Sequence, residues 1–167
     1  KRVRSVTNTK RLSFGESLRV LFREAKGDAI VYMDIASSIG IGAFPTLIEK
    51  LHDADIVIAS RFGQRKPSEV FPTSFLFQTY LLMCKFLFKL RIQDIHPKLM
   101  FLYRDVALSL DLKALDRNIF PELFLRSRKK NLIVQEFFVD SSYLSRQPRQ
   151  VQGCSFFTFV GLFGIGQ

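Results

Sequence analysis

The sequence feature that most constrains the fold is the stretch of residues 26–34, which reads KGDAIVYMD. Gly27 stops the amphipathic segment before it, and residues 29–33 then form a continuous apolar run. A short apolar run after turn residues is typical of a strand buried on both faces of a helix-covered sheet. Open α/β sheets bind ligands at the carboxyl ends of their strands, so the sequence predicts that Asp34 lies at a ligand-binding edge.

The rest of the chain continues this alternation of helix and strand patterns. Helical spacing of apolar residues predicts helices over residues 12–26, 43–53, 73–90, 104–112 and 120–129, and short apolar runs predict strands over residues 29–33, 55–59, 99–103 and 132–139. Pro45 suits a first helical turn, and Asn131 suits a helix end. We therefore expect an α/β domain over residues 1–145 with a mainly parallel sheet flanked by helices, in which strands 29–33 and 55–59 are adjacent and parallel.

Charge and apolar content indicate the kinds of partner that suit this chain. Its 25 Lys and Arg against 15 Asp and Glu give a net charge of +10, which favours polyanions such as nucleic acid, anionic lipid or phosphorylated ligands. The 18 Phe residues lie in apolar runs and not among basic residues, as a base-stacking surface would require, so nucleic acid is the weakest of these candidates. Two Cys without zinc-type spacing exclude a disulfide framework and a zinc site.

Two strongly apolar segments suggest contact with a membrane surface. Residues 75–90 and 154–166 are both shorter than the roughly 20 residues that a membrane-spanning helix needs. We expect the first to be a helix that is buried or lies in the membrane interface. The second belongs to an apolar tail, residues 146–167, which is expected to be either interfacial or without fixed structure.

Several motifs occur in an order that resembles a known enzyme family. They are AKGD at residues 25–28, YMD at 32–34, ADIVIASRF at 54–62 and RIQD at 91–94. In this order and spacing, over about residues 8–143, the chain resembles the family 2 glycosyltransferases of the GT-A fold, especially the dolichyl- or polyprenyl-phosphate mannosyl- and glucosyltransferases. The resemblance implies transfer of a sugar from a nucleotide-sugar to a polyprenyl phosphate by a cytoplasmic protein held peripherally at the membrane.

The resemblance also implies roles for residues on the donor side. Asp34 would be catalytic and would hold the donor diphosphate through Mg²⁺ or Mn²⁺, because the charge of a leaving diphosphate must be neutralised. Arg61, at the end of the next strand, would pair with the phosphates, and Ser37 and Ser38 would donate hydrogen bonds to them. The alternatives remain open: Asp34 could cap a turn, Arg61 could be an ordinary surface residue, and the serines could only fill a loop.

On the acceptor side the resemblance points to the loop after the apolar helix. Asp94 would be the second catalytic residue and would lie near the acceptor phosphate, although it could equally cap the turn before Pro97. Lys98 and His96 are the nearby candidates for the phosphate-binding cation that the family places in this loop. A single histidine more often has a structural role.

Three departures from the family pattern lead to a rival interpretation. Ala36 stands where the family's metal-binding D-x-D motif has its second acid, and residues 95–100 replace the family's G-F-R/K element. The family's first βα unit has no counterpart before Lys1, so we expect an N-terminally incomplete or reduced relative. The rival is therefore a non-catalytic, membrane-associated binding module on a degenerate glycosyltransferase scaffold.

Overall fold

The computed structural model describes residues 5–34, 41–60, 75–88, 92–138 and 158–163. The helices are α1 (Phe14–Glu24), the 3₁₀ helix η1 (Ile41–Ala43), α2 (Phe44–Leu51), α4 (Phe75–Phe88), α5 (Arg104–Ser109) and α6 (Ile119–Lys129). The strands are β1 (Ala29–Asp34), β2 (Ile56–Ser60), β3 (Leu99–Tyr103), β4 (Val134–Phe138) and β5 (Thr158–Phe163). Every helix and strand predicted between residues 12 and 139 therefore has a counterpart, and the α/β class is confirmed.

The sheet is mixed, with strand order β4-β2-β3-β1-β5. β3 runs antiparallel to both β1 and β2 and lies between them, pairing Phe101 with Val31 on one side and with Val57 on the other. The predictions that these two strands are neighbours and that the sheet is mainly parallel are therefore wrong; among the described strands only β2 and β4 form a parallel pair. An apolar run shows that a strand is buried, but it does not show which strand pairs with it.

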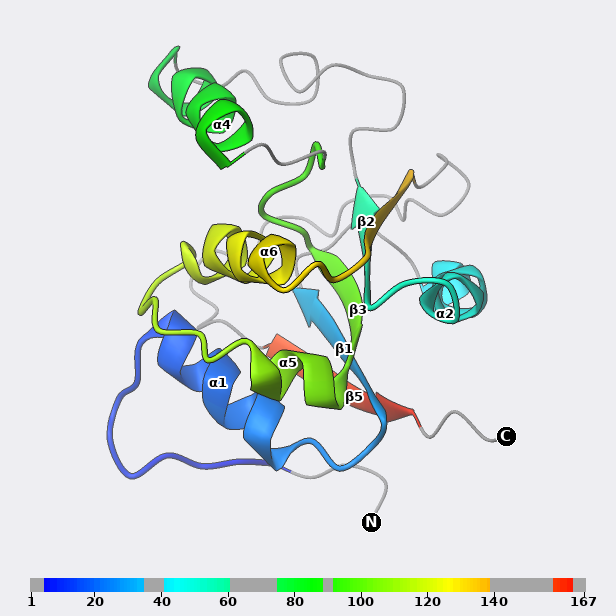
Figure 1. The fold of residues 1–167 in the computed structure, drawn as a ribbon. Helices are drawn as coiled ribbons and strands as arrows, with labels where there is room; N and C mark the ends of the chain where they lie inside the picture. The colour runs from blue at the N-terminus through cyan, green and yellow to red at the C-terminus, as the bar shows by residue number, and fades with distance from the viewer. Residues whose placement is uncertain (1–4, 35–40, 61–74, 89–91, 139–157, 164–167) are drawn as a thin grey trace.

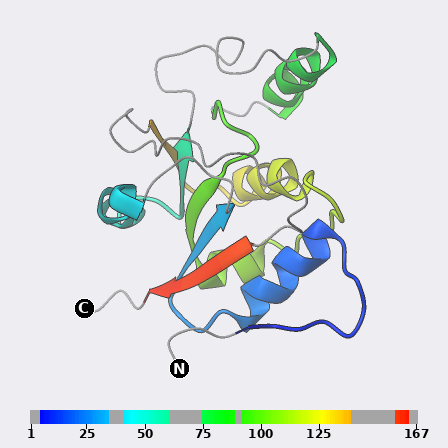
Figure 2. The ribbon, with the colours of Figure 1, turned by 180° about the vertical axis from the view of Figure 1, so that it is seen from behind.

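Strand β5 occupies the other side of β1, and Figure 2 shows the two strands side by side. They pair antiparallel from Asp34 opposite Thr158 to Ala29 opposite Phe163. Part of the apolar tail, which we expected to be interfacial or without fixed structure, is thus a strand of the sheet. Its content of Val, Phe and Thr fits a strand, and the pairing covers an edge that β1 would otherwise leave open.

The two faces of the sheet carry separate apolar cores. Ile30 and Tyr32 of β1 belong to the core formed with α1, α5 and α6, whereas Ala29 and Val31 belong to the core formed with α2. Figure 1 shows the resulting three layers, with α1, α5 and α6 on one face of the sheet and α2 on the other. The alternation follows from the two-residue period of a strand. It explains why the run from residue 29 to residue 33 has no polar face.

Local hydrogen bonds define the start of α1 and the end of α6. Ser13 and Glu16 form a reciprocal capping box at the start of α1, with the Ser13 N–H donating to the Glu16 carboxylate at 2.8 Å. α6 ends at Lys129, and just beyond it Asn131 has a left-handed φ of 56° while the N–H of Leu132 donates to the Ser127 carbonyl at 2.9 Å. This Schellman-type end confirms the helix stop predicted at Asn131.

Candidate functional site

One end of the sheet brings together Asp34 and Lys98, which the sequence singled out, and the neighbouring Ser60. β1 and β2 both point toward this end, and the antiparallel β3 begins there, so Asp34, Ser60 and Lys98 come to the same end of the sheet. Figure 1 shows α4 beyond this end, on the side toward which β1 and β2 point. The carboxyl ends of the strands, which we call the sheet edge from here on, are also where ligands bind in open α/β sheets.

Asp34 is the centre of a compact charge cluster. Its side chain is about 10% exposed, and its Oδ2 atom lies 2.6 Å from the Lys98 ammonium and 3.7 Å from the Arg117 guanidinium. The backbone reinforces this arrangement, because the Asp34 N–H donates to the Lys98 carbonyl at 2.8 Å. Arg117 also lies over the Phe14 ring, 5.0 Å from its centroid. Two cations therefore surround one carboxylate, as a largely buried anion requires.

Asp94 is almost fully buried in the loop that leads into β3, with 1% of its surface exposed. Glu136 of β4 holds this loop, since its two carboxylate oxygens accept the N–H groups of Gln93 at 2.7 Å and of Asp94 at 2.9 Å. The Asp94 carboxylate itself accepts the His96 N–H at 3.3 Å. Asp94 therefore caps a turn, which is the alternative that the sequence left open, and its predicted acceptor role stays a prediction.

His96 packs between aromatic rings beside this loop. Its ring is stacked on Tyr80 at 6.0 Å and lies edge-on to Phe120 at 6.3 Å. The Tyr80 hydroxyl lies 3.4 Å from His96 Nε2 and donates to the Asn118 side chain at 3.3 Å. Burial raises the pKa of Tyr80 to about 12, so this hydroxyl keeps its proton at neutral pH. These contacts join α4 to the loop and fit a structural role for His96.

The remaining predicted donor-site residues, Ser37, Ser38 and Arg61, lie outside the described residues. Sequence reasoning also missed two residues that the fold brings into the site. Arg117 lies in the irregular segment between α5 and α6, and Glu136 lies in β4, which was predicted as a strand from its apolar residues. No local motif marks either residue, because each acts on a partner at least 42 positions away.

The described residues around Asp34 do not fit the expected Mg²⁺ or Mn²⁺ site. Ala36 has no side-chain oxygen to bind a cation, and Oδ2 of Asp34 already accepts a hydrogen bond from the Lys98 ammonium. Within residues 5–34, 41–60, 75–88 and 92–138, no group of three or more His, Cys, Asp or Glu side chains is placed to hold a metal ion. Mg²⁺ is usually held by one or two carboxylates together with water and substrate phosphates, and Asp34, the carboxylate expected to hold it here, is already paired with two cations.

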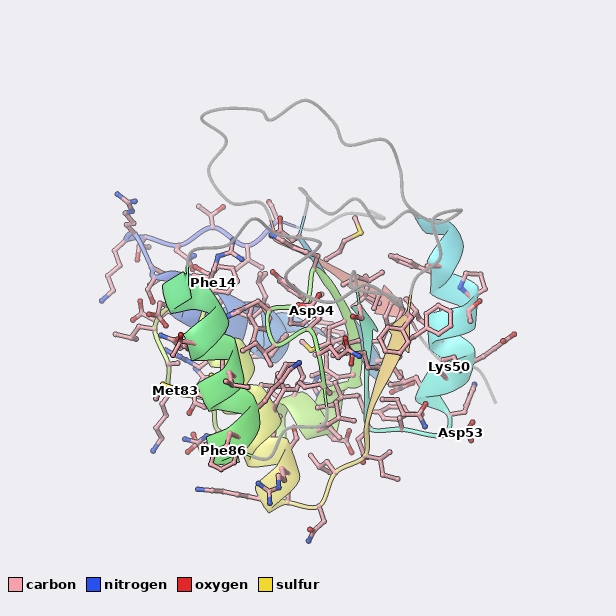
Figure 3. All side chains as sticks on the ribbon, turned by 90° about the horizontal axis from the view of Figure 1, so that it is seen from above. Phe14, Lys50, Asp53, Met83, Phe86 and Asp94 are labelled. Carbon is pink, nitrogen blue, oxygen red and sulfur yellow. The ribbon has the colours of Figure 1, made fainter. Side chains whose placement is uncertain are left out.

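Helix α4 presents an apolar surface beside the site. Leu82, Met83 and Phe86 are 68%, 53% and 81% exposed, whereas Cys84 of the same helix is buried. Figure 3 shows Met83 and Phe86 on the side of α4 that faces away from Asp94. Among the helices in the described part of the chain, none combines the length and the apolar character needed to cross a bilayer. We call Leu82, Met83 and Phe86 the α4 apolar surface.

This arrangement can bind an anion next to an apolar surface. Two partly exposed cations contact the Asp34 carboxylate, so an anionic ligand would meet positively charged side chains at this end of the sheet. Comparison with known proteins gives no further guide, because no protein-family model and no curated protein matches this chain.

Proposed function

We propose that this chain transfers a sugar from a nucleotide-sugar to a polyprenyl (dolichyl) phosphate at the cytoplasmic face of a membrane, as a peripheral glycosyltransferase of the GT-A type. The observation that supports this most is the placement of Lys98 and Arg117 on Asp34 at the ligand-binding edge of the sheet. The motifs at residues 25–34, 54–62 and 91–94 support the same family. The site chemistry suits a ligand that carries a diphosphate.

The transfer requires charge neutralisation more than acid–base chemistry. An oxygen of the acceptor phosphate forms a bond to the anomeric carbon, and the bond from that carbon to the diphosphate oxygen breaks. The electron pair leaves with the nucleoside diphosphate. Because the attacking phosphate is already ionised, the protein mainly needs to position two anions and neutralise the leaving group.

The residues of the site would divide these tasks between two sides. Lys98 and Arg117 would neutralise the diphosphate, with Asp34 holding both cations in place. Arg61, Ser37 and Ser38 are proposed to add phosphate contacts. Asp94, fixed by the loop and by Glu136, would lie on the acceptor side.

The lipid acceptor explains why an apolar surface would lie beside a charged site. A polyprenyl chain stays in the bilayer while its phosphate reaches the protein, so the protein must sit on the membrane. The α4 apolar surface offers side chains for shallow insertion, and the net charge of +10 adds attraction to anionic lipid.

A non-catalytic binding module is the second candidate function. Ala36 in place of the second acid favours it, as does the engagement of Asp34 by two cations. Such a module would bind the nucleotide part of the donor at the same edge and would leave the sugar in place.

A glycolipid-formation assay separates the two candidates. The full chain is incubated with vesicles that contain polyprenyl phosphate and with a panel of nucleotide-sugars, and glycolipid is measured by mass spectrometry. We expect product with the parent and a loss of at least tenfold with Asp34→Asn. The control is Asp53→Asn, which changes an exposed acid just after α2, on a different segment from the site residues.

Circular dichroism of each variant checks that the fold is kept. If the parent binds a nucleoside diphosphate but forms no glycolipid, the non-catalytic module is correct. If it neither forms glycolipid nor binds nucleoside diphosphate, both candidates are wrong.

A further inference from the structure

The position of Lys98 at the Asp34 carboxylate resembles that of a bound cation. Its Nζ atom lies 2.6 Å from Oδ2, slightly closer than the roughly 2.7–2.9 Å typical of a charge-assisted N–H···O bond. A Mg²⁺ ion on the same oxygen would sit at roughly 2.0–2.1 Å from it and would be in close repulsive contact with the ammonium. The ammonium and the metal ion are therefore competing occupants of one place.

From this geometry we infer that Lys98, supported by Arg117, replaces the divalent cation, so that the chain binds the diphosphate group of a nucleotide without a metal ion. The inference rests on the proposed function, since it concerns the same edge of the sheet. It deepens that proposal by naming what neutralises the ligand. It also accounts for Ala36, because a site that uses an ammonium does not need a second metal-binding acid.

Exposure and charge support the same assignment. The side chains of Lys98 and Arg117 are 23% and 38% exposed, whereas that of Asp34 is 10% exposed. An incoming anion would thus meet the cations before the carboxylate. Two cations contact the Asp34 carboxylate, and the Lys98 ammonium has three N–H donors, of which Asp34 accepts one.

The backbone also holds Lys98 ready for a ligand. Lys98 directly precedes β3, and its carbonyl accepts the Asp34 N–H at 2.8 Å while its side chain returns to the Asp34 carboxylate. The cation is therefore fixed from both ends before any ligand arrives. A preorganised charge of this kind stabilises an anion without the cost of reorganising the site.

Titration calorimetry of the full chain with UDP and with GDP tests the inference. The parent is measured in EDTA, in Mg²⁺ and in Mn²⁺, and we expect the same dissociation constant in all three within about twofold. Lys98→Met should weaken binding in EDTA by about 10- to 100-fold, as expected for the loss of one charge-assisted contact. Lys98→Arg should keep most of the affinity.

The matched control is Lys113→Met, which removes an exposed lysine that lies 3.5 Å from the exposed Asp111 and should bind like the parent. Binding that requires Mg²⁺ or Mn²⁺ would overturn the inference while leaving the proposed function intact. Equal binding by Lys98→Met and the parent would also overturn it. The metal comparison needs no variant, so it decides the question even if Lys98→Met misfolds. If the parent binds neither nucleotide under any of the three conditions, the proposed function fails as well.

Discussion

Gly15 in the first turn of α1 offers the sharpest test of the packing, because local and tertiary arguments predict opposite signs for Gly15→Ala. Helix propensity alone predicts that alanine stabilises the helix by up to about 1 kcal/mol. A Cβ atom at this position, however, would lie 2.1 Å from the Ala114 carbonyl oxygen and 2.9 Å from the carbonyl carbon of Leu115. Both are backbone atoms, so no side-chain rotation can relieve the contact.

The loop at residues 114–115 is itself held in place, which raises the cost of moving it. The Gly15 N–H donates to the Leu115 carbonyl at 2.7 Å, and the Arg19 guanidinium donates to the Ala114 carbonyl at 2.7 Å. Overpacking typically costs 1–3 kcal/mol, and each hydrogen bond lost in the shift adds about 1 kcal/mol. After the gain in helix propensity, we expect Gly15→Ala to lower the free energy of unfolding by about 2–3 kcal/mol.

Urea denaturation followed by circular dichroism measures this difference, with the denaturant slope expected to stay the same. Gly42→Ala is the control, because it adds the same methyl group at an exposed glycine of η1 and should change stability by less than about 0.5 kcal/mol. If Gly15→Ala is as stable as the parent or more stable, the close packing of α1 on the 114–115 loop is wrong.

Three further predictions concern the loop anchor, the pH dependence of stability and the membrane. Glu136→Gln removes one of the two oxygens that hold Gln93 and Asp94, so it should lower the free energy of unfolding by about 1–3 kcal/mol and speed amide hydrogen exchange at those two residues. Gln135→Ala is the control and should leave that exchange unchanged. Equal exchange in Glu136→Gln and the parent would disprove the anchor. Burial raises the pKa of Glu122, but the N–H groups of Ala114 and Lys113 and the Arg126 side chain outweigh it and lower that pKa below its ordinary value of 4.5. A carboxyl group whose pKa is lowered in the folded state stabilises the fold at pH values above its unfolded-state pKa, and this contribution is lost as the pH falls through its folded-state pKa. Glu122→Gln should therefore be less stable than the parent at neutral pH, and the difference in free energy of unfolding should narrow as the pH falls below 4.5. Urea unfolding across that pH range would contradict this if the difference stays constant. In flotation on phosphatidylserine vesicles at low salt, the parent should float with the vesicles, and a Leu82→Ser/Phe86→Ser double variant should float less. Leu115→Ser changes another exposed apolar residue and should match the parent. Undiminished flotation of the double variant would exclude the α4 apolar surface as the membrane contact.

The sequence by itself determined where the helices and strands between residues 12 and 139 lie. The apolar run at residues 29–33 is β1 in the structure apart from the added Asp34, residues 99–103 are β3, and Asn131 takes up its left-handed conformation just after α6. These features depend on neighbours within a few positions, so periodicity and turn chemistry reveal them. The Ser13 and Glu16 capping box was equally readable, and it would have placed the start of α1 correctly.

Only the tertiary structure decided how these elements combine. β3 entered between β1 and β2, and part of the apolar tail paired with β1, because the apolar runs are similar enough that their order depends on the packing of the whole chain. Lys98 reached Asp34 across 64 positions, and Glu136 reached Asp94 across 42. Such contacts close long loops and are fixed by the joint burial of many side chains, a property that no local pattern of residues records.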